Sequence, residues 1–518
     1  MSGEEGAGPG RGRGRAIGRG PRRATVSPSG AASAASPGLG LVTKVSYGFG
    51  SVAQATAGAA LSQGTITFFL VRVAGLEPAV VGVVMFVSLA IDATLDPLIG
   101  RISDTLRTPW GRRHPFMYAS ALPIALAIFF LWRPPHAFAP EAIAVYTLVL
   151  LVVLRLCVSL YQIPSDALTP ELAPDYHDRT SLISFRYFFG FVGGIVVSFV
   201  MQFVFLRKDA SHPLGALDPA AYANFGALAA VLTFAAILLS SAATHRYIKR
   251  LWISPPRRQS MIGAVREVFA TFANPSLISV MGAGLLAGIA GGVTNTLGAF
   301  MSYYFWDLTP QMAGVIGLIS ALSTIVATIA APPLSRALDK KRTMLVVFAL
   351  AIMGGVLPVC LRLVGLMPPN GSAAVPVILA ADGLFSNTLA LIGYIIIGSM
   401  VADVAEDNAV KTGRRSEGLL FAASNLLPKF TTGIGAVLGA AILILVRFPT
   451  GAQASHVDHV DPTIMRHMAL LWLPAALGLN LAAVSVLLFY RLDRTTHEAN
   501  LEALSHTPAF EPPSDLLP

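Results

Sequence analysis

Long apolar runs are the feature that most constrains the fold of this chain. Stretches of about 20 apolar residues recur along most of its 518 residues, and an α-helix needs a run of about that length to cross a bilayer. Hydrophobic residues make up 54% of the sequence and charged residues only 13%, which leaves too little polar surface to cover a soluble globule. The sequence therefore predicts an all-α, multi-pass integral membrane protein in contact with the lipid bilayer.

Twelve transmembrane helices are expected, in two groups of six. We place them at residues 45–73, 79–102, 115–133, 141–165, 180–206, 221–244, 274–305, 310–332, 343–366, 374–402, 417–447 and 465–490. The segment between the sixth and seventh spans is polar and basic and holds the helix breakers Pro255 and Pro256. We therefore expect two six-helix bundles at 41–246 and 273–492, joined by a cytoplasmic linker at 247–272.

The flanks and loops indicate how the chain is oriented. Residues 1–40 are rich in Gly, Ser, Ala, Pro and Arg, a composition typical of a disordered basic tail, and residues 493–518 form a second expected tail. The loops after spans 2, 6, 8 and 10 hold most of the loop lysines and arginines, so these loops and both termini should be cytoplasmic. In a bacterium this membrane would be the inner one. The basic residues behind the net charge of +9 then serve to orient the helices in the membrane, so we expect no nucleic-acid partner.

Two carboxylates in the second expected span carry the strongest functional signal. Asp92 and Asp96 are four residues apart and so share one helical face. Each carboxylate costs at least ~2.5 kcal/mol at the bilayer centre, so the pair needs a bound cation, a shared proton or a facing arginine. Arg155 in the fourth span is the natural partner. The pair is either a cation site or a set of ion pairs that locks helices together.

A polar loop follows the same span. Asp104, Arg107, Arg112 and Arg113 lie where the helix leaves the membrane. Such residues can form ion pairs that hold one conformation of a rocking transporter, or they can serve as a cytoplasmic anchor.

Several motifs together resemble one transporter family. Gly100-x-x-x-Asp104 followed by Gly111-Arg112-Arg113 is similar to the loop motif of the major facilitator superfamily. The motifs that resemble its glycoside–pentoside–hexuronide:cation symporter branch, which includes melibiose permease, are Thr43–Gly50, Asp92 with Asp96-Pro97, Gly111–Pro115, Ile163-Pro164, Arg179–Arg186, Thr412–Gly418 and Pro428-Lys429-Phe430. The resemblance covers residues 42 to 492. It implies two six-helix bundles that rock about a central cavity, and cation-coupled symport of a sugar or glycoside.

The resemblance also implies roles for individual residues. Asp92 and Asp96, with Ser159, would bind the coupling cation, which is sodium, lithium or a proton. The residues expected to line or adjoin the substrate site are Gln54, Arg155, Gln162, Asp166, Arg186, Asp382 and Lys429. Those expected to gate the conformational change are Asp104, Arg107, Arg112, Arg113, Arg414, Arg415 and Glu417. Apart from the coupling ion we expect no cofactor and no resident metal, and we expect a monomer.

Departures from the family pattern leave the cargo open. Gln54-Ala55 stands where the melibiose type has a lysine–aspartate pair, Gln162 replaces a sugar-binding aspartate, and Leu95 replaces an asparagine. Because the galactoside clamp is missing, a lysolipid or another amphipath is an alternative cargo. A non-transporting receptor or a membrane-embedded enzyme on the same fold is a second alternative. The sequence contains no P-loop, zinc-protease or nucleophile-elbow motif, so we do not expect an enzyme.

Overall fold

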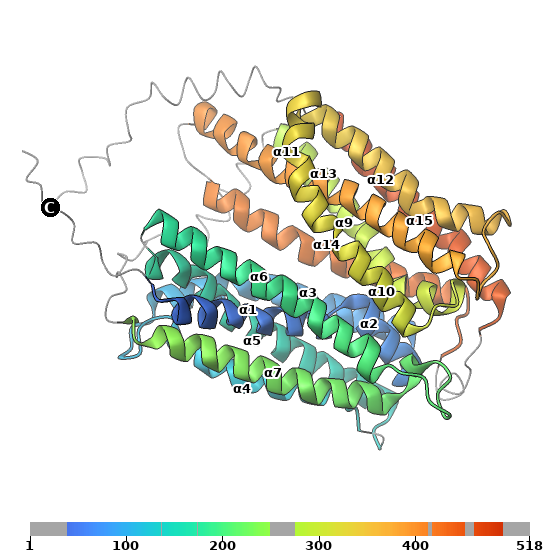
Figure 1. The fold of residues 1–518 in the computed structure, drawn as a ribbon, viewed down its shortest axis with the longest axis horizontal. Coiled ribbons are helices and arrows are strands. Elements are labelled where there is room, and N and C mark those ends of the chain that lie inside the picture. Colours follow the sequence, from blue (N-terminus) through green and yellow to red (C-terminus); the bar gives the residue numbers. More distant parts are fainter. Residues whose placement is uncertain are drawn as a thin grey trace, which may run out of the picture. The chain divides into compact units, whose positions relative to one another are not determined.

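The structure, a computed structural model, describes residues 39–135, 137–173, 175–248, 275–412, 417–450 and 460–490. Within these ranges every regular element is a helix (Figure 1). Nearly all of the expected tail at 1–40, most of the expected linker at 247–272 and the whole stretch after residue 490 lie outside the described residues. Arg414 and Arg415 lie outside them as well.

The first half of the chain holds the helices of the first expected bundle. They are α1 Leu41–Ala60, α2 Gln63–Phe68, η1 Phe69–Val73, α3 Pro78–Thr105, α4 His114–Leu131, α5 Pro140–Leu172, α6 Tyr176–Val200, η2 Met201–Phe205, η3 Gly215–Leu217 and α7 Pro219–His245. Proline stands in the first turn of α3, α4, α5 and α7. Proline suits that turn because its fixed φ is helical and its missing N–H would have had no partner there.

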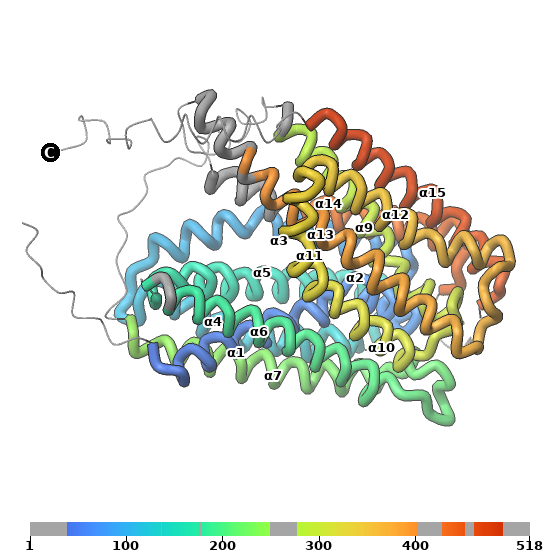
Figure 2. Tube along the Cα trace, turned by 45° about the horizontal axis from the view of Figure 1, so that its top comes forward, coloured from blue at the N-terminus to red at the C-terminus, as the bar shows by residue number. Residues whose placement is uncertain are grey.

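The second half repeats this arrangement. Its helices are α9 Pro275–Phe300, η5 Met301–Phe305, α10 Pro310–Ala321, α11 Ser323–Leu338, α12 Lys340–Leu363, α13 Ala374–Thr412, α14 Glu417–Leu445 and α15 Pro462–Leu487. Figure 2 follows the two halves by colour, from blue to green for α1–α7 and from yellow-green to red for α9–α15. Below, the linker end is the end of the bundle at which α3, α5 and α7 finish, and the distal end is the opposite one.

The expected fold class is confirmed. Eleven helical segments within the described ranges are long and apolar enough to cross a membrane. The first expected span is filled by α1, α2 and η1, with a break at Leu61 and Ser62, and it was predicted as one continuous helix. The eighth expected span is likewise divided into α10 and α11, which meet at Leu322.

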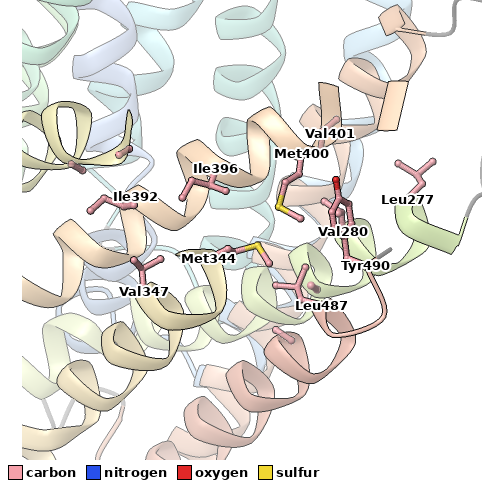
Figure 3. Close-up of a cluster of buried hydrophobic side chains, with 14 residues drawn as sticks. Leu277, Val280, Met344, Val347, Ile392, Ile396, Met400, Val401, Leu487 and Tyr490 are labelled. Atoms are coloured by element: carbon pink, nitrogen blue, oxygen red, sulfur yellow. The ribbon is translucent and has the colours of Figure 1, made fainter. Parts of the chain in front are cut away.

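Each half is held together by its own helix contacts. In the first half α1 packs against α6 and α7, and in the second half α9 packs against α14 and α15. Small residues let backbones approach closely inside a membrane: a Cβ added to Gly435 would lie only 2.5 Å from the Gly292 Cα. Figure 3 shows an apolar cluster of the second half, in which Met344 of α12 and Ile396 of α13 lie among side chains from α9, α11 and α15.

One long contact joins the two halves. Helix α3 of the first half packs along α14 of the second half. A Cβ added to Gly82 of α3 would lie 2.8 Å from the Ala440 Cβ, and one added to Gly433 of α14 would lie 3.1 Å from the Phe86 ring. This close packing brings the acidic face of α3 against α14.

Candidate functional site

A lysine from the second half neutralises both carboxylates of the first half. The Lys429 Nζ on α14 lies 2.8 Å from the Asp92 Oδ2 and 2.5 Å from the Asp96 Oδ2, both on α3. The four-residue spacing puts both carboxylates on one face of α3, as predicted, and that face meets α14. One ammonium group therefore links the two halves through two ion pairs.

Two side chains of α5 complete this cluster. The Ser159 Oγ donates a hydrogen bond of 3.3 Å to the Asp92 Oδ1, and the Arg155 Nη1 lies 3.9 Å from the Asp92 Oδ2. The Asp92, Arg155 and Ser159 side chains are buried. The Asp96 and Lys429 side chains are 30% and 27% exposed, so the cluster is not sealed between helices. We call Asp92, Asp96, Arg155, Ser159 and Lys429 the carboxylate cluster.

The chemistry of the carboxylate cluster suits a hard cation. Its acceptors are carboxylate and hydroxyl oxygens, the ligand type that small hard cations prefer, and either carboxylate could instead take a proton. The Asp96 Oδ1 is buried and has no hydrogen-bond partner among the described residues, so one acceptor is available. A cation and the Lys429 ammonium would compete for the same oxygens because both need the negative charge of the two aspartates.

A cavity of about 670 Å³ lies on the first half, and its lining residue Gln162 is one turn along α5 from Ser159 of this cluster. It brings together four of the predicted substrate residues: Gln54 of α1, Gln162 and Asp166 of α5, and Arg186 of α6. The Gln54 Nε2 is buried, and no side chain or backbone group in the described part of the chain forms a hydrogen bond with it. An unpaired buried amide is costly, so Gln54 is a donor that is free to bind a solute.

Tyr47 and Thr169 hold Arg186 in place at this cavity. The Arg186 Nη2 pairs with Asp166, and its Nη1 donates to the Tyr47 Oη at 3.1 Å and to the Thr169 Oγ1 at 3.3 Å. The guanidinium carbon also lies 5.3 Å from the centre of the Tyr47 ring. Tyr47 was not predicted as a site residue, although it belongs to the Thr43–Gly50 motif that carries the family resemblance.

Three other predicted substrate residues do not line this cavity. Arg155 and Lys429 contact the carboxylates instead. Asp382 of α13 accepts a 3.0 Å hydrogen bond from the Ser386 Oγ inside the second half. Direct contact of these three residues with substrate stays a prediction.

The loop between α3 and α4 is clamped onto the linker end of α5. Arg112 and Arg113 both pair with Glu171, the latter at 2.6 Å between its Nη2 and the Glu171 Oε1. The Arg113 Nη2 also lies 3.7 Å from the Asp104 Oδ1. Burial lowers the pKa of the Arg113 guanidinium from its ordinary value, and the Glu171 carboxylate opposes that shift. Glu171 was not predicted, although an acid at the end of a span with basic loop neighbours is a readable signal.

The structure gives no ion pair for the other predicted gating residues among those it describes. Arg107 is exposed. Arg414 and Arg415 lie outside the described residues, and the same holds for the side chain of Glu417. In the second half, Lys340 at the start of α12 pairs with Asp403 of α13, with the Nζ 2.7 Å from the Oδ2. This contact is the counterpart of the clamp between the α3–α4 loop and α5.

At the distal end a buried arginine joins the two halves. Arg72 of η1 has no exposed surface. Its Nε donates to the Tyr304 Oη at 2.8 Å and its Nη1 to the Pro449 carbonyl at 3.3 Å. Its guanidinium also lies 5.2 Å from the Tyr304 ring centre and 5.7 Å from that of Phe448. Arg72 was not predicted, yet it is a charged residue inside an apolar run.

A second contact closes the distal end. The Gln311 Nε2 of α10 donates to the carbonyl oxygens of Gln202 at 2.8 Å and of Leu206 at 3.0 Å. Together with Arg72, these bonds tie η1 and η2 of the first half to the second half.

Comparison with a solved structure supports the fold. The nucleoside transporter NupG matches with a TM-score of 0.59 and 16% sequence identity, over 87% of this chain and 100% of that protein. At this identity the likeness concerns the fold alone.

Relatives in sequence are transport proteins. An uncharacterised symporter of Synechocystis is 24% identical, with 89% of this chain and 95% of that protein covered. The isoprimeverose transporter of Lactiplantibacillus pentosus is 23% identical, with 83% of this chain and 84% of the relative covered. The model of the MFS/sugar transport protein family matches residues 46–494. MFS stands for the major facilitator superfamily, so this match confirms the resemblance that the motifs indicate. This chain therefore belongs to the MFS/sugar transport protein family.

Proposed function

We propose that this protein is a secondary transporter that couples the movement of a sugar or glycoside to that of sodium or a proton by alternating access. The observation that carries the proposal is that Lys429 of the second half forms ion pairs with both Asp92 and Asp96 of the first half. The cavity lies close by, because Ser159 of the cluster and Gln162 of the cavity are one turn apart on α5.

The carboxylate cluster offers a physical route to coupling. Two carboxylates face two cationic side chains, Lys429 and Arg155, so the cluster is close to electrically neutral without a bound ion. A cation that takes the place of Lys429 keeps this balance at the carboxylates and releases the ion pairs between α3 and α14. A ligand shifts a conformational equilibrium only if it binds one state more tightly than the other. A cation binds more tightly to the state in which Lys429 has left the carboxylates, so its binding favours the separation of α3 from α14.

The cavity has the groups that a sugar needs. Gln54 and Arg186 offer N–H donors, and Gln162 and Asp166 offer acceptors for hydroxyl groups. The volume of about 670 Å³ falls within the usual range for small-molecule sites. The names of the relatives support the same cargo class, since one is a symporter and another an isoprimeverose transporter.

We infer that the linker end faces the cytoplasm and that both termini lie there. The basic residues Arg112, Arg113 and Lys340 all lie at this end, as the positive-inside rule requires. Contacts of Arg72 and Gln311 close the distal end, and the Asp166 side chain on the cavity is 49% exposed. The conformation is therefore inward-facing in our account. We further propose that the protein acts as a monomer in the cytoplasmic membrane.

A solute panel in sealed vesicles tests the proposed function. Reconstituted protein should accumulate at least one sugar or glycoside when an inward sodium or proton gradient is imposed, and should not do so without it. Gln54→Leu removes the unpaired donor without adding charge, so the KM for that solute should rise about tenfold, the effect of one lost hydrogen bond to a ligand. The maximal rate should keep its cation dependence.

Two results would contradict the proposal. A solute that binds but is never accumulated under either gradient would indicate a receptor. A lysolipid that is accumulated while every sugar is ignored would assign the amphipath as cargo. Membership of a transporter family already sets the enzyme alternative aside.

A further inference from the structure

One aromatic ring on the wall of the proposed sugar site has no protein partner. Tyr187 of α6 lines the same cavity as Gln54, Asp166 and Arg186, and its side chain is 77% exposed. Across the ranges that the structure describes, Tyr187 makes no side-chain hydrogen bond, no ring contact and no cation–π contact. Its ring is therefore available to a solute in the cavity.

Other tyrosines of the first half use their rings and hydroxyl groups within the protein. Tyr47 donates a hydrogen bond to the Ser165 carbonyl, and its ring lies beside the Arg186 guanidinium. Tyr222 donates to the Ala216 carbonyl, and its ring stacks on Trp132. Aromatic side chains with a few polar groups are the usual lining of small-molecule sites, so a tyrosine without such contacts on a cavity wall indicates a place where a ligand binds.

The spacing of residues along α6 leaves room beside this ring. Ile183, Tyr187 and Phe191 follow one another at four-residue intervals, so they share one face of the helix, and all three line the cavity. Gly190 lies on the same face one turn from Tyr187. A Cβ added to Gly190 would meet only the Ser51 Cβ of α1, at 3.5 Å. The missing side chain therefore keeps the space next to the Tyr187 ring open.

A pyranose ring offers two kinds of surface to such a wall. Its edge carries hydroxyl groups, which the Gln54 amide and the Asp166–Arg186 pair can bind. Its faces carry C–H groups, whose apolar surface is favourably removed from water. The face of an aromatic ring is electron-rich and suits contact with such groups. The cavity wall thus has partners for both surfaces of a sugar.

We propose that Tyr187 is the stacking residue of the solute site. One C–H face of a pyranose ring lies against the Tyr187 ring, while Gln54 and Arg186 bind hydroxyl groups at the edge of the sugar. This inference rests on the proposed function, because it names a binding residue of the same site.

Substitutions at Tyr187 test this assignment. The probes are the methyl pyranosides of glucose, galactose and xylose, measured by equilibrium binding to the purified full-length chain. For the sugar that is recognised, Tyr187→Leu should weaken binding roughly tenfold, the effect of one lost aromatic contact. Tyr187→Phe keeps the ring and should keep the affinity. Phe188→Leu is the matched control, because Phe188 is also exposed, at 57%, but does not line the cavity; its affinity should be unchanged.

A fluorescence signal separates direct contact from a structural role. Tyr187→Trp places an indole at the stacking position, so addition of the recognised methyl pyranoside should change its emission. That change should exceed the one in the unmodified protein, whose sequence has five tryptophans. Phe188→Trp should add no change, because that position lies outside the cavity lining.

Each other outcome would overturn the proposal. Unweakened binding in Tyr187→Leu, or a loss in Tyr187→Phe as large as that in Tyr187→Leu, would show that the ring does not stack on the sugar. Equal losses in Tyr187→Leu and Phe188→Leu would indicate that both residues only support α6. An unchanged emission in a Tyr187→Trp variant that still binds would exclude contact. If no pyranoside binds the unmodified protein, the proposed function falls as well; if one binds and no Tyr187 variant alters its binding, only this inference falls.

Discussion

Asp92→Asn should abolish the accumulation of solute against its gradient, while exchange of solute across the membrane continues. The amide keeps the size of the side chain but offers no charge to a cation, and the loss of a charged ligand costs about 2–3 kcal/mol, or roughly 30- to 150-fold in cation affinity. Asp96→Asn should have the same effect because Lys429 contacts both carboxylates. Uptake into sealed vesicles under an imposed sodium or proton gradient measures accumulation, and counterflow measures exchange.

The matched control for this experiment is Glu141→Gln, which neutralises an exposed carboxylate at the start of α5. It should accumulate solute like the unmodified protein. Full-rate, fully cation-dependent uptake by Asp92→Asn would show that the carboxylates only lock helices together, the interpretation that the sequence left open.

Arg72→Gln should open the distal end. The guanidinium donates hydrogen bonds to Tyr304 and Pro449 and lies over two aromatic rings, and a charged hydrogen bond together with a desolvated cation–π contact is worth about 2 kcal/mol or more. The ratio of the distal-closed population to the distal-open population should therefore fall roughly 30-fold. Uptake should fall, because the variant rests in the outward-facing state.

Thiol labelling measures this shift. With Cys157 and Cys360 replaced by serine, Thr65→Cys places one thiol on α2, where the side chain lines a cavity between α6 and α10. A membrane-impermeant reagent added from the distal side should label it slowly when Arg72 is intact and quickly in Arg72→Gln. Arg133→Gln is the control, since Arg133 contacts Phe129 within its own half. Equal labelling rates with and without the Arg72→Gln substitution would mean that Arg72 does not hold the distal end closed.

Much of the fold could be predicted from the sequence, because bilayer thickness sets the length of each apolar run. The break at Leu61 and Ser62 could not be predicted. The hydrophobicity of a segment reflects its composition and does not show where helical hydrogen bonds are interrupted. The meeting point of α10 and α11 at Leu322 escaped prediction for the same reason.

The candidate site was predictable only in part. The spacing of Asp92 and Asp96 gives a shared face, but their pairing with Lys429, more than 300 residues away, depends on the packing of α3 against α14. The family resemblance supplied that lysine. Arg72 and Glu171 were missed because each lies near the end of a span, where a charged residue is ordinarily assigned to the membrane surface.

Cation binding by Lys429→Gln tests the central claim most directly. If the lysine and the coupling cation compete for Asp92 and Asp96, removal of the ammonium should tighten cation binding by about tenfold, since each lost ion pair is worth up to about 1 kcal/mol. The measurement is equilibrium titration of the purified protein with sodium, or of its proton uptake by a pH indicator. Tighter binding in Lys429→Gln, with binding weakened roughly 30- to 150-fold in Asp92→Asn, is the predicted result. Unchanged or weaker binding in Lys429→Gln, or unweakened binding in Asp92→Asn, would contradict the account.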